Sequence, residues 1–139
     1  MPPWIRVIAI CVFRNADRIL VFDVPDPPRA TGYRSLGGTV EFGERAIDAC
    51  AREILEETGT TVSGLRLLGV LESRFVYRGE PGHEIVFVFD GTVDDASLYA
   101  RATIDCMEGP HALVARWMSI DAFGPEAPLY PDGLLELLR

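Results

Sequence analysis

Two stretches of this chain are apolar at nearly every position, a pattern typical of strands that are covered on both faces. Residues 5–13 and 85–89 are rich in β-branched and aromatic side chains, so the pattern predicts two central strands of a sheet. A sheet with two apolar faces needs a covering layer on each side. We therefore expect an α/β fold in which helices lie on both faces of a mixed sheet.

The rest of the pattern predicts shorter elements, separated by glycine and proline. The run 85–89 belongs to a strand expected over residues 84–93, which a turn at 79–82 joins to a strand over 65–77. Further strands are expected over 18–24, 33–36 and 111–120, and helices over 45–58 and 132–139. Gly59 is expected to cap the first helix. Residues 25–32 read as an exposed loop that could cover a ligand, and residues 94–110 show no clear period and are expected to be irregular. The order of the strands cannot be read from these patterns.

Composition limits what the chain can bind. Its 139 residues and 48% hydrophobic content suit one domain, residues 1–139, with a sizeable core. A formal charge of −8 would repel an extended nucleic acid, but it leaves room for a small phosphorylated ligand. All 13 basic residues are arginine, whose planar fork suits phosphate oxygens, but composition bias is the favoured explanation.

The cysteines and the first apolar run bear on location. Cys11, Cys50 and Cys106 are widely spaced in apolar surroundings, which favours reduced core cysteines and a reducing cytoplasm. The first apolar run contains Arg6 and resembles no secretion signal, and no segment approaches a membrane-spanning length. We expect no membrane partner.

Carboxylates are crowded on one face of the first predicted helix. At 100° per residue, Glu53, Glu56 and Glu57 fall within roughly a quarter of the helix circumference. Small side chains at Ala46, Ala49 and Cys50 continue the same stripe, while Ile47, Ala51 and Ile54 form the adjoining apolar side.

A solvated acidic face would be the ordinary interpretation of such a cluster. Like charges at these spacings repel, however, and the small residues indicate close approach by other backbone, so the acids should need a cation. Hard oxygen donors favour Mg²⁺ or Mn²⁺ over zinc. Gly37 and Gly38 let backbone approach closely enough for a carbonyl to join the ligands.

The motif around these acids resembles the signature of the Nudix hydrolases. It reads Gly38-Thr-Val-Glu-Phe-Gly-Glu44, a spacer over 45–51, then Arg52-Glu53-Ile54-Leu55-Glu56-Glu57-Thr58-Gly59. Thr60 stands where the family has a bulky aliphatic residue, so the box spans residues 38–60. The resemblance implies the family's α/β/α sandwich over the whole chain, and members commonly form homodimers, although no pattern here demands one.

The resemblance also implies roles. Glu53, Glu56 and Glu57 look like metal ligands, Glu53 also serves as the base in some members, and the Gly37 or Gly38 carbonyl is similar to the backbone ligand. Arg52 and Glu44 resemble the pair that orients the cluster. Many members use a further acid from a later loop; Glu108 is our choice here, with Asp94 and Asp95 as rivals.

The chemistry implied is attack of water on one phosphorus of a diphosphate bridge. Arg34, and after it Arg29, are candidates for holding substrate phosphates. His83-Glu84 could supply a base or another ligand, although a histidine after a turn is usually structural. Aromatic residues that could stack on a base, but that more often pack in a core, are Trp4, Phe75, Tyr77 and Trp117.

The substrate stays open among several nucleotides. The leading hypothesis is a nucleoside di- or triphosphate pyrophosphohydrolase, because markers of the NADH, coenzyme A and mRNA-decapping subgroups are missing. Tyr77, 17 residues after Thr60, has a spacing similar to that in dinucleoside polyphosphate hydrolases. The alternatives are a dinucleoside polyphosphate hydrolase, an ADP-ribose or nucleotide-sugar hydrolase, and a regulatory module that binds nucleotides without turnover.

Overall fold

A computed structural model describes residues 3–25 and 31–139 of the chain. Among these residues the strands are β1 (Arg6–Asn15), β2 (Arg18–Val24), β3 (Gly32–Arg34), β4 (Leu36–Thr39), β5 (Val62–Tyr77), β6 (Glu80–Val93), β7 (Thr103–Glu108), β8 (His111–Ser119) and β9 (Leu129–Tyr130). The α-helices are α1 (Ala46–Thr58) and α2 (Leu134–Leu138), and two 3₁₀ turns are η1 (Ala96–Ala100) and η2 (Ile120–Ala122).

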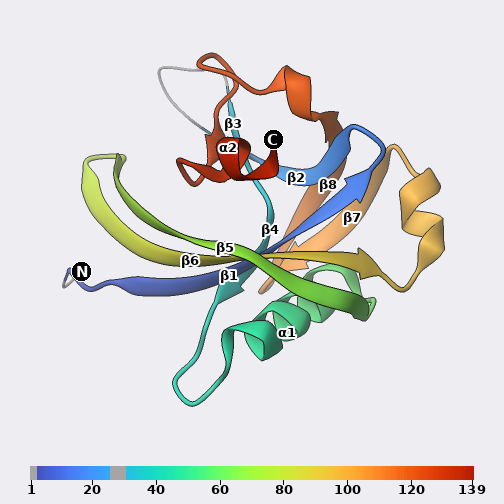
Figure 1. Cartoon of the computed structure of the whole chain (residues 1–139), viewed down its shortest axis with the longest axis horizontal. Coiled ribbons are helices and arrows are strands. Elements are labelled where there is room, and N and C mark those ends of the chain that lie inside the picture. Colours follow the sequence, from blue (N-terminus) through green and yellow to red (C-terminus); the bar gives the residue numbers. More distant parts are fainter. Residues whose placement is uncertain (1–2, 26–30) are drawn as a thin grey trace.

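Strand β1 joins the two parts of the sheet. It pairs parallel with β6 and antiparallel with β4, and β5 lies outside β6. Its last two residues pair with β2, from which the sheet continues to β3 and β9 on one side and to β8 and β7 on the other. The mixed α/β architecture is confirmed, and Figure 1 shows α1 and α2 on opposite sides of the sheet.

Alternate residues of β1 enter two different cores, as its continuous apolar run predicts. Ala9, Cys11 and Phe13 pack on the side of α1, whereas Ile10 and Val12 pack on the side of α2. The three cysteines are free and buried, as expected. In the described part of the chain no helix is long and apolar enough to cross a membrane.

Helix α1 begins and ends within one residue of its predicted bounds. Gly59 follows it at φ 77° and donates its N–H to the Leu55 carbonyl over 2.9 Å, so the predicted C-terminal cap is confirmed. Ile54 is fully buried. Ile47 is 41% exposed, so the expected apolar side of the helix does not extend to its first turn.

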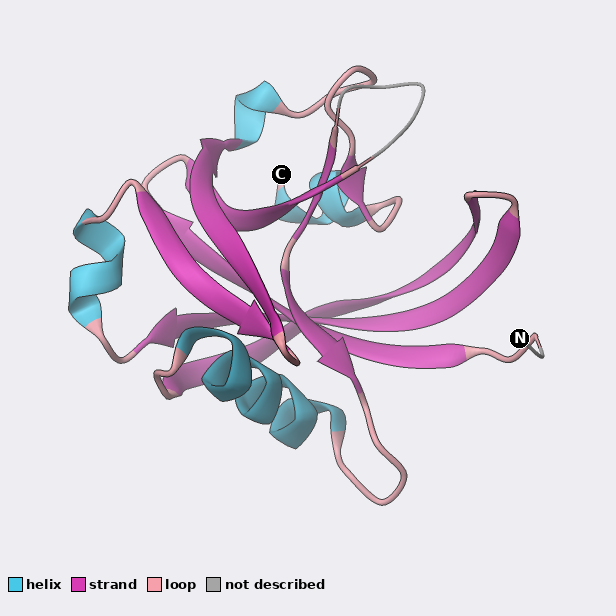
Figure 2. Ribbon diagram, turned by 180° about the vertical axis from the view of Figure 1, so that it is seen from behind, coloured by secondary structure: helices cyan, strands magenta, loops and turns pink. Residues whose placement is uncertain are grey.

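The β5–β6 hairpin is longer than expected and curls away from the rest of the sheet (Figure 2). The turn is Arg78-Gly79, at φ 51° and 81°, and Tyr77 pairs directly with Glu80. A turn over 79–82 was therefore the wrong choice, since β6 already begins at Glu80.

Two other expectations were wrong. Residues 94–110 contain η1 and β7, and β7 forms a hairpin with β8 through Gly109-Pro110. The single strand expected over 33–36 is divided at Ser35, because β3 pairs with β2 and β9 whereas β4 pairs with β1. The pair Gly37-Gly38 consequently lies inside β4 and does not end a strand.

Candidate active site

A cavity of about 820 Å³ lies between β4, the carboxylate face of α1 and the curled β5–β6 hairpin. Its inner wall contains Gly37, Gly38, Glu53 and Glu56. The opposite wall is formed by the hairpin, including Phe75 and Tyr77, and by the β7–β8 turn. Two of the three predicted carboxylates, Glu53 and Glu56, therefore face a cavity of the size that small ligands occupy, whereas Glu57 is not part of its wall.

Glu57 is the most deeply placed of the three helix carboxylates, with 3% of its surface exposed. Its Oε1 accepts a hydrogen bond of 2.9 Å from the Gly37 N–H, while its Oε2 is buried without a partner. Burial raises the pKa of Glu57 to about 8; Arg34 opposes the shift, and the charges of Glu53 and Glu108 add to it. A buried carboxylate oxygen without a donor leaves one position for a cation.

Glu53 lies directly against β4. A Cβ atom at Gly38 would come within 2.4 Å of the Glu53 carboxyl carbon, so only glycine leaves room for this side chain. Burial raises the pKa of Glu53, and the Arg52 guanidinium opposes that shift.

Arg52 and Glu44 form a two-pronged ion pair that fixes the loop before α1. The Arg52 Nε and Nη2 donate to the two Glu44 carboxylate oxygens at 2.8 and 2.9 Å, and Nη2 also donates to the Thr39 carbonyl at 3.0 Å. The hydrogen bond from Arg52 lowers the pKa of Glu44 to about 2. The Arg52 Nη1 also lies 3.0 Å from Glu53 Oε1 and 3.3 Å from Glu56 Oε1.

The donor set suits a hard divalent cation. Its atoms are carboxylate and backbone oxygens only, and one of them, the Oε2 of Glu57, is buried without a partner. No three His, Cys, Asp or Glu side chains of the described residues already stand at the spacing of a metal cluster. Arg52 is paired with both Glu53 and Glu56, so these carboxylates would have to turn from Arg52 to bind an ion.

Glu108 and Arg34 meet at the mouth of the cavity. Their side chains form an ion pair, and the Arg34 guanidinium lies 4.9 Å above the Phe22 ring. The rivals are placed elsewhere: Asp94 accepts hydrogen bonds from the hydroxyls of Thr61 and Ser63, and Asp95 caps η1. Neither Asp94 nor Asp95 lines the cavity.

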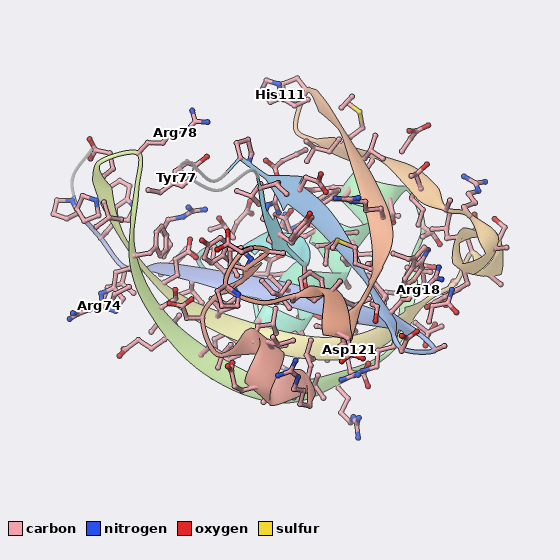
Figure 3. The ribbon with its side chains drawn as sticks, turned by 90° about the horizontal axis from the view of Figure 1, so that it is seen from above. Arg18, Arg74, Tyr77, Arg78, His111 and Asp121 are labelled. Carbon is pink, nitrogen blue, oxygen red and sulfur yellow. The ribbon has the colours of Figure 1, made fainter. Side chains whose placement is uncertain are left out.

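Of the other candidates, Tyr77 and Phe75 line the cavity, whereas Trp4 and Trp117 do not. Figure 3 shows Tyr77 directed inward from the hairpin and Arg74 directed outward, and the Tyr77 hydroxyl donates to the Pro25 carbonyl at 3.2 Å. Trp117 stacks on Tyr99 in the core, and Trp4 is 60% exposed. Arg29 lies outside the described residues.

His83 and Glu84 point to opposite faces of β6, as successive strand residues do. His83 lies 3.7 Å from Glu72, away from the cavity, whereas Glu84 lines it. Sequence reasoning missed Arg6, Ser35 and Ser73, which also line the cavity. The alternation of Ser73, Phe75 and Tyr77 on one strand face was the available signal.

Metal removal should make the stability of the protein pH-dependent through Glu57. A pKa raised from 4.5 to about 8 means that the folded state holds the proton more tightly than the unfolded chain. This stabilisation is complete below about pH 4.5 and is lost as pH rises toward 8. In EDTA, we expect the unfolding temperature to fall between pH 5.5 and about 8, more steeply than in the Glu57→Gln variant.

Magnesium should reverse most of that loss at pH 8 in the wild-type protein. Thermal scans at several pH values in EDTA measure how steeply the unfolding temperature falls with pH. An equally steep fall in wild type and in Glu57→Gln would contradict this role of Glu57.

The fold matches that of known proteins. The structure is similar to a MutT NUDIX hydrolase from Burkholderia pseudomallei, with a TM-score of 0.71 at 21% identity over 97% of both chains. It is also similar to a NUDIX hydrolase from Nitrosomonas europaea, with a TM-score of 0.67 at 24% identity over 99% of this chain and 86% of that one. An ADP-ribose pyrophosphatase from Streptococcus suis has a TM-score of 0.59 at 15% identity, over 96% and 86% of the two chains.

The family assignment rests on the sequence match, because structural likeness at such identities shows the fold alone. The NUDIX domain model matches residues 3–137, nearly the whole chain, and two acids of the motif, Glu53 and Glu56, line the cavity just described. The chain therefore belongs to the NUDIX domain family and is a Nudix hydrolase.

Proposed function

We propose that this protein hydrolyses a diphosphate linkage in a nucleoside di- or triphosphate, with Mg²⁺ or Mn²⁺ as cofactor. The observation that carries the proposal is the unpartnered, buried Oε2 of Glu57 beside Glu53 and the backbone of β4. Glu53, Glu56, Glu57 and the Gly37 or Gly38 carbonyl would hold the ion, with Glu108 as a further ligand. The chemistry that such an ion supplies is neutralisation of phosphate oxygens and activation of water.

The protein's own groups prepare the reaction around that site. Arg34 lies in the cavity wall and can donate to phosphate oxygens once it releases Glu108. The Arg52–Glu44 pair holds the β4–α1 loop in place, so the carboxylates keep their positions. Glu53 can accept a proton from the attacking water, because its pKa is raised above that of an exposed carboxylate.

The cavity is large enough for a nucleotide. Its volume of about 820 Å³ is within the range of ligand pockets. Hydrolysis of ADP-ribose or a nucleotide sugar stays the second candidate, since these carry one base and a small second group.

A substrate screen tests the proposal directly. With Mg²⁺, we expect release of a nucleoside monophosphate from at least one nucleoside di- or triphosphate, and loss of that release in EDTA. Phosphate and pyrophosphate are measured beside the nucleotide products, with dinucleoside polyphosphates, ADP-ribose and nucleotide sugars in the same panel. Tight binding of nucleotides without any product would favour the regulatory module instead.

Other features are part of the same proposal. We propose one domain over residues 1–139, with its signature at 38–60, that acts in the cytoplasm on a small molecule. A homodimer is compatible with this function, and light scattering of the purified protein decides it.

A further inference from the structure

The part of the cavity farthest from α1 contains a carboxylate that phosphate chemistry does not use. Glu84 lies in the cavity wall with 19% of its side chain exposed, 3.4 Å from the Arg6 guanidinium. Within the described residues that ion pair is its only direct polar contact. Because a carboxylate can accept several hydrogen bonds, Glu84 retains free acceptor capacity toward the cavity.

An aromatic ring lies next to this carboxylate on the same face of the hairpin. Phe75 pairs with Gly82, and a Cβ atom at Gly82 would lie 2.3 Å from the Phe75 ring, so the ring packs directly on the glycine backbone. Phe75 also lines the cavity and is 39% exposed. A ring supported on one side and accessible on the other is a platform on which a flat heterocycle can stack.

The sheet register sets the ring and the carboxylate side by side. Ser73 pairs with Glu84 as Phe75 pairs with Gly82, so Phe75 and Glu84 are diagonal neighbours, about 7–8 Å apart between backbones. That spacing places the edge of a base stacked on Phe75 near the Glu84 oxygens. The buried hydroxyl of Ser35 also lines this cavity and has no partner.

We propose that Phe75 and Glu84 form a base-recognition subsite, in which Glu84 accepts hydrogen bonds from two adjacent N–H groups of a guanine-type base. This inference rests on the proposed function, because it supposes that the ligand is a nucleotide. Guanine presents a ring N–H beside an amino group, which together match the two oxygens of one carboxylate. Adenine presents a ring lone pair beside its amino group, and that lone pair would face an acceptor that cannot donate.

Nucleotides that differ by single groups test this subsite. In Mg²⁺ we expect kcat/KM to fall in the order GTP, ITP, ATP, by about tenfold or more per lost N–H contact, since hydrogen bonds to a charged group have that effect. Removal of the ribose 2′-hydroxyl should matter little, so dGTP should match GTP within about threefold.

Substitution of the carboxylate should abolish the preference. Glu84→Gln should lower kcat/KM for GTP by at least about tenfold and should not lower it for ATP, because the amide can donate to the adenine ring nitrogen and accept from the adenine amino group. The matched control is Glu80→Gln, an exposed carboxylate four residues earlier on the same strand, which should change neither. Circular dichroism establishes that both variants are folded.

Each other result has a defined meaning. If GTP, ITP and ATP are hydrolysed equally well, the inference is overturned while the proposed function stands. If dGTP is much poorer than GTP and Glu84→Gln removes that difference, the carboxylate holds the ribose, which also overturns it.

If no nucleotide is hydrolysed, calorimetric titration with GMP and AMP separates the two proposals. A preference for GMP that depends on Glu84 would support the subsite although the proposed reaction had failed. The lack of such a preference would overturn the subsite as well.

Discussion

Replacing Glu53 by glutamine should lower kcat by about 10³-fold, while the fold and the affinity for nucleotide change little. Glu53 faces the cavity and contacts both Arg52 and the Gly38 backbone. An amide of the same shape keeps the packing but supplies neither the charge that a cation needs nor a base for water. The measurement is single-turnover hydrolysis of the best nucleotide in saturating Mg²⁺, together with a titration of nucleotide binding.

A second variant on the same helix separates this effect from a general loss of charge. Asp48→Asn removes an exposed carboxylate from the first turn of α1, outside the cavity, and should leave kcat within about twofold of wild type. If Glu53→Gln retained more than about a tenth of the wild-type kcat, the central role of this carboxylate would be wrong.

Gly37→Ala should destabilise the fold by about 3 kcal/mol or more. Gly37 has φ 143°, and a Cβ atom there would lie 2.2 Å from the Ala9 carbonyl oxygen on the neighbouring strand. The carbonyl oxygen is a backbone atom that cannot turn aside, so β4 would have to separate from β1. Denaturant titration followed by circular dichroism measures the loss.

The neighbouring glycine provides a matched comparison. In Gly38→Ala the new methyl group meets the carboxyl group of Glu53, which can swing aside, so folding should be much less affected than activity. Stability losses of equal size in the two variants would show that contact with β1, rather than room for Glu53, governs both positions. Full activity in Gly38→Ala would show that the observed position of Glu53 is not needed.

Local patterns predicted the elements whose partners are near in sequence or whose burial is complete. The runs in β1 and β6 are apolar at successive positions because both faces of these strands are covered, by α1 on one side and α2 on the other. The length of α1 follows from its helix-forming residues and from Gly59. These signals depend on neighbouring positions alone, so they can be read without knowing the fold.

Elements that depend on distant partners could not be read in this way. In β7 only Ile104 and Cys106 are buried, and an alternation that short resembles an irregular segment until β8 is placed beside it. The division at Ser35 follows from pairing of β3 and β4 with different strands. Strand pairing of this kind depends on all the strands of the sheet, including those distant in sequence.

In the candidate site, too, some features follow from local spacing and others from contacts with distant strands. The helical spacing of Glu53, Glu56 and Glu57 sets them on one face, and the motif around them identifies the chemistry. The depth of each carboxylate depends on β4: Glu57 is buried against the Gly37 N–H, whereas the side chain of Glu56 is 58% exposed. The sequence favoured Glu108 over Asp94 and Asp95, and the β7–β8 hairpin places Glu108, but neither aspartate, in the cavity wall.

By itself the sequence determined the family, the carboxylate face of α1 and the strands with two covered faces, because these depend on residue type and on spacing along one element. Only the tertiary structure decided which side chains share the cavity, since Arg34, Phe75, Glu84 and Glu108 come from four separate strands. Their proximity results from strand pairing over long sequence separations, which side-chain spacing within one element does not encode.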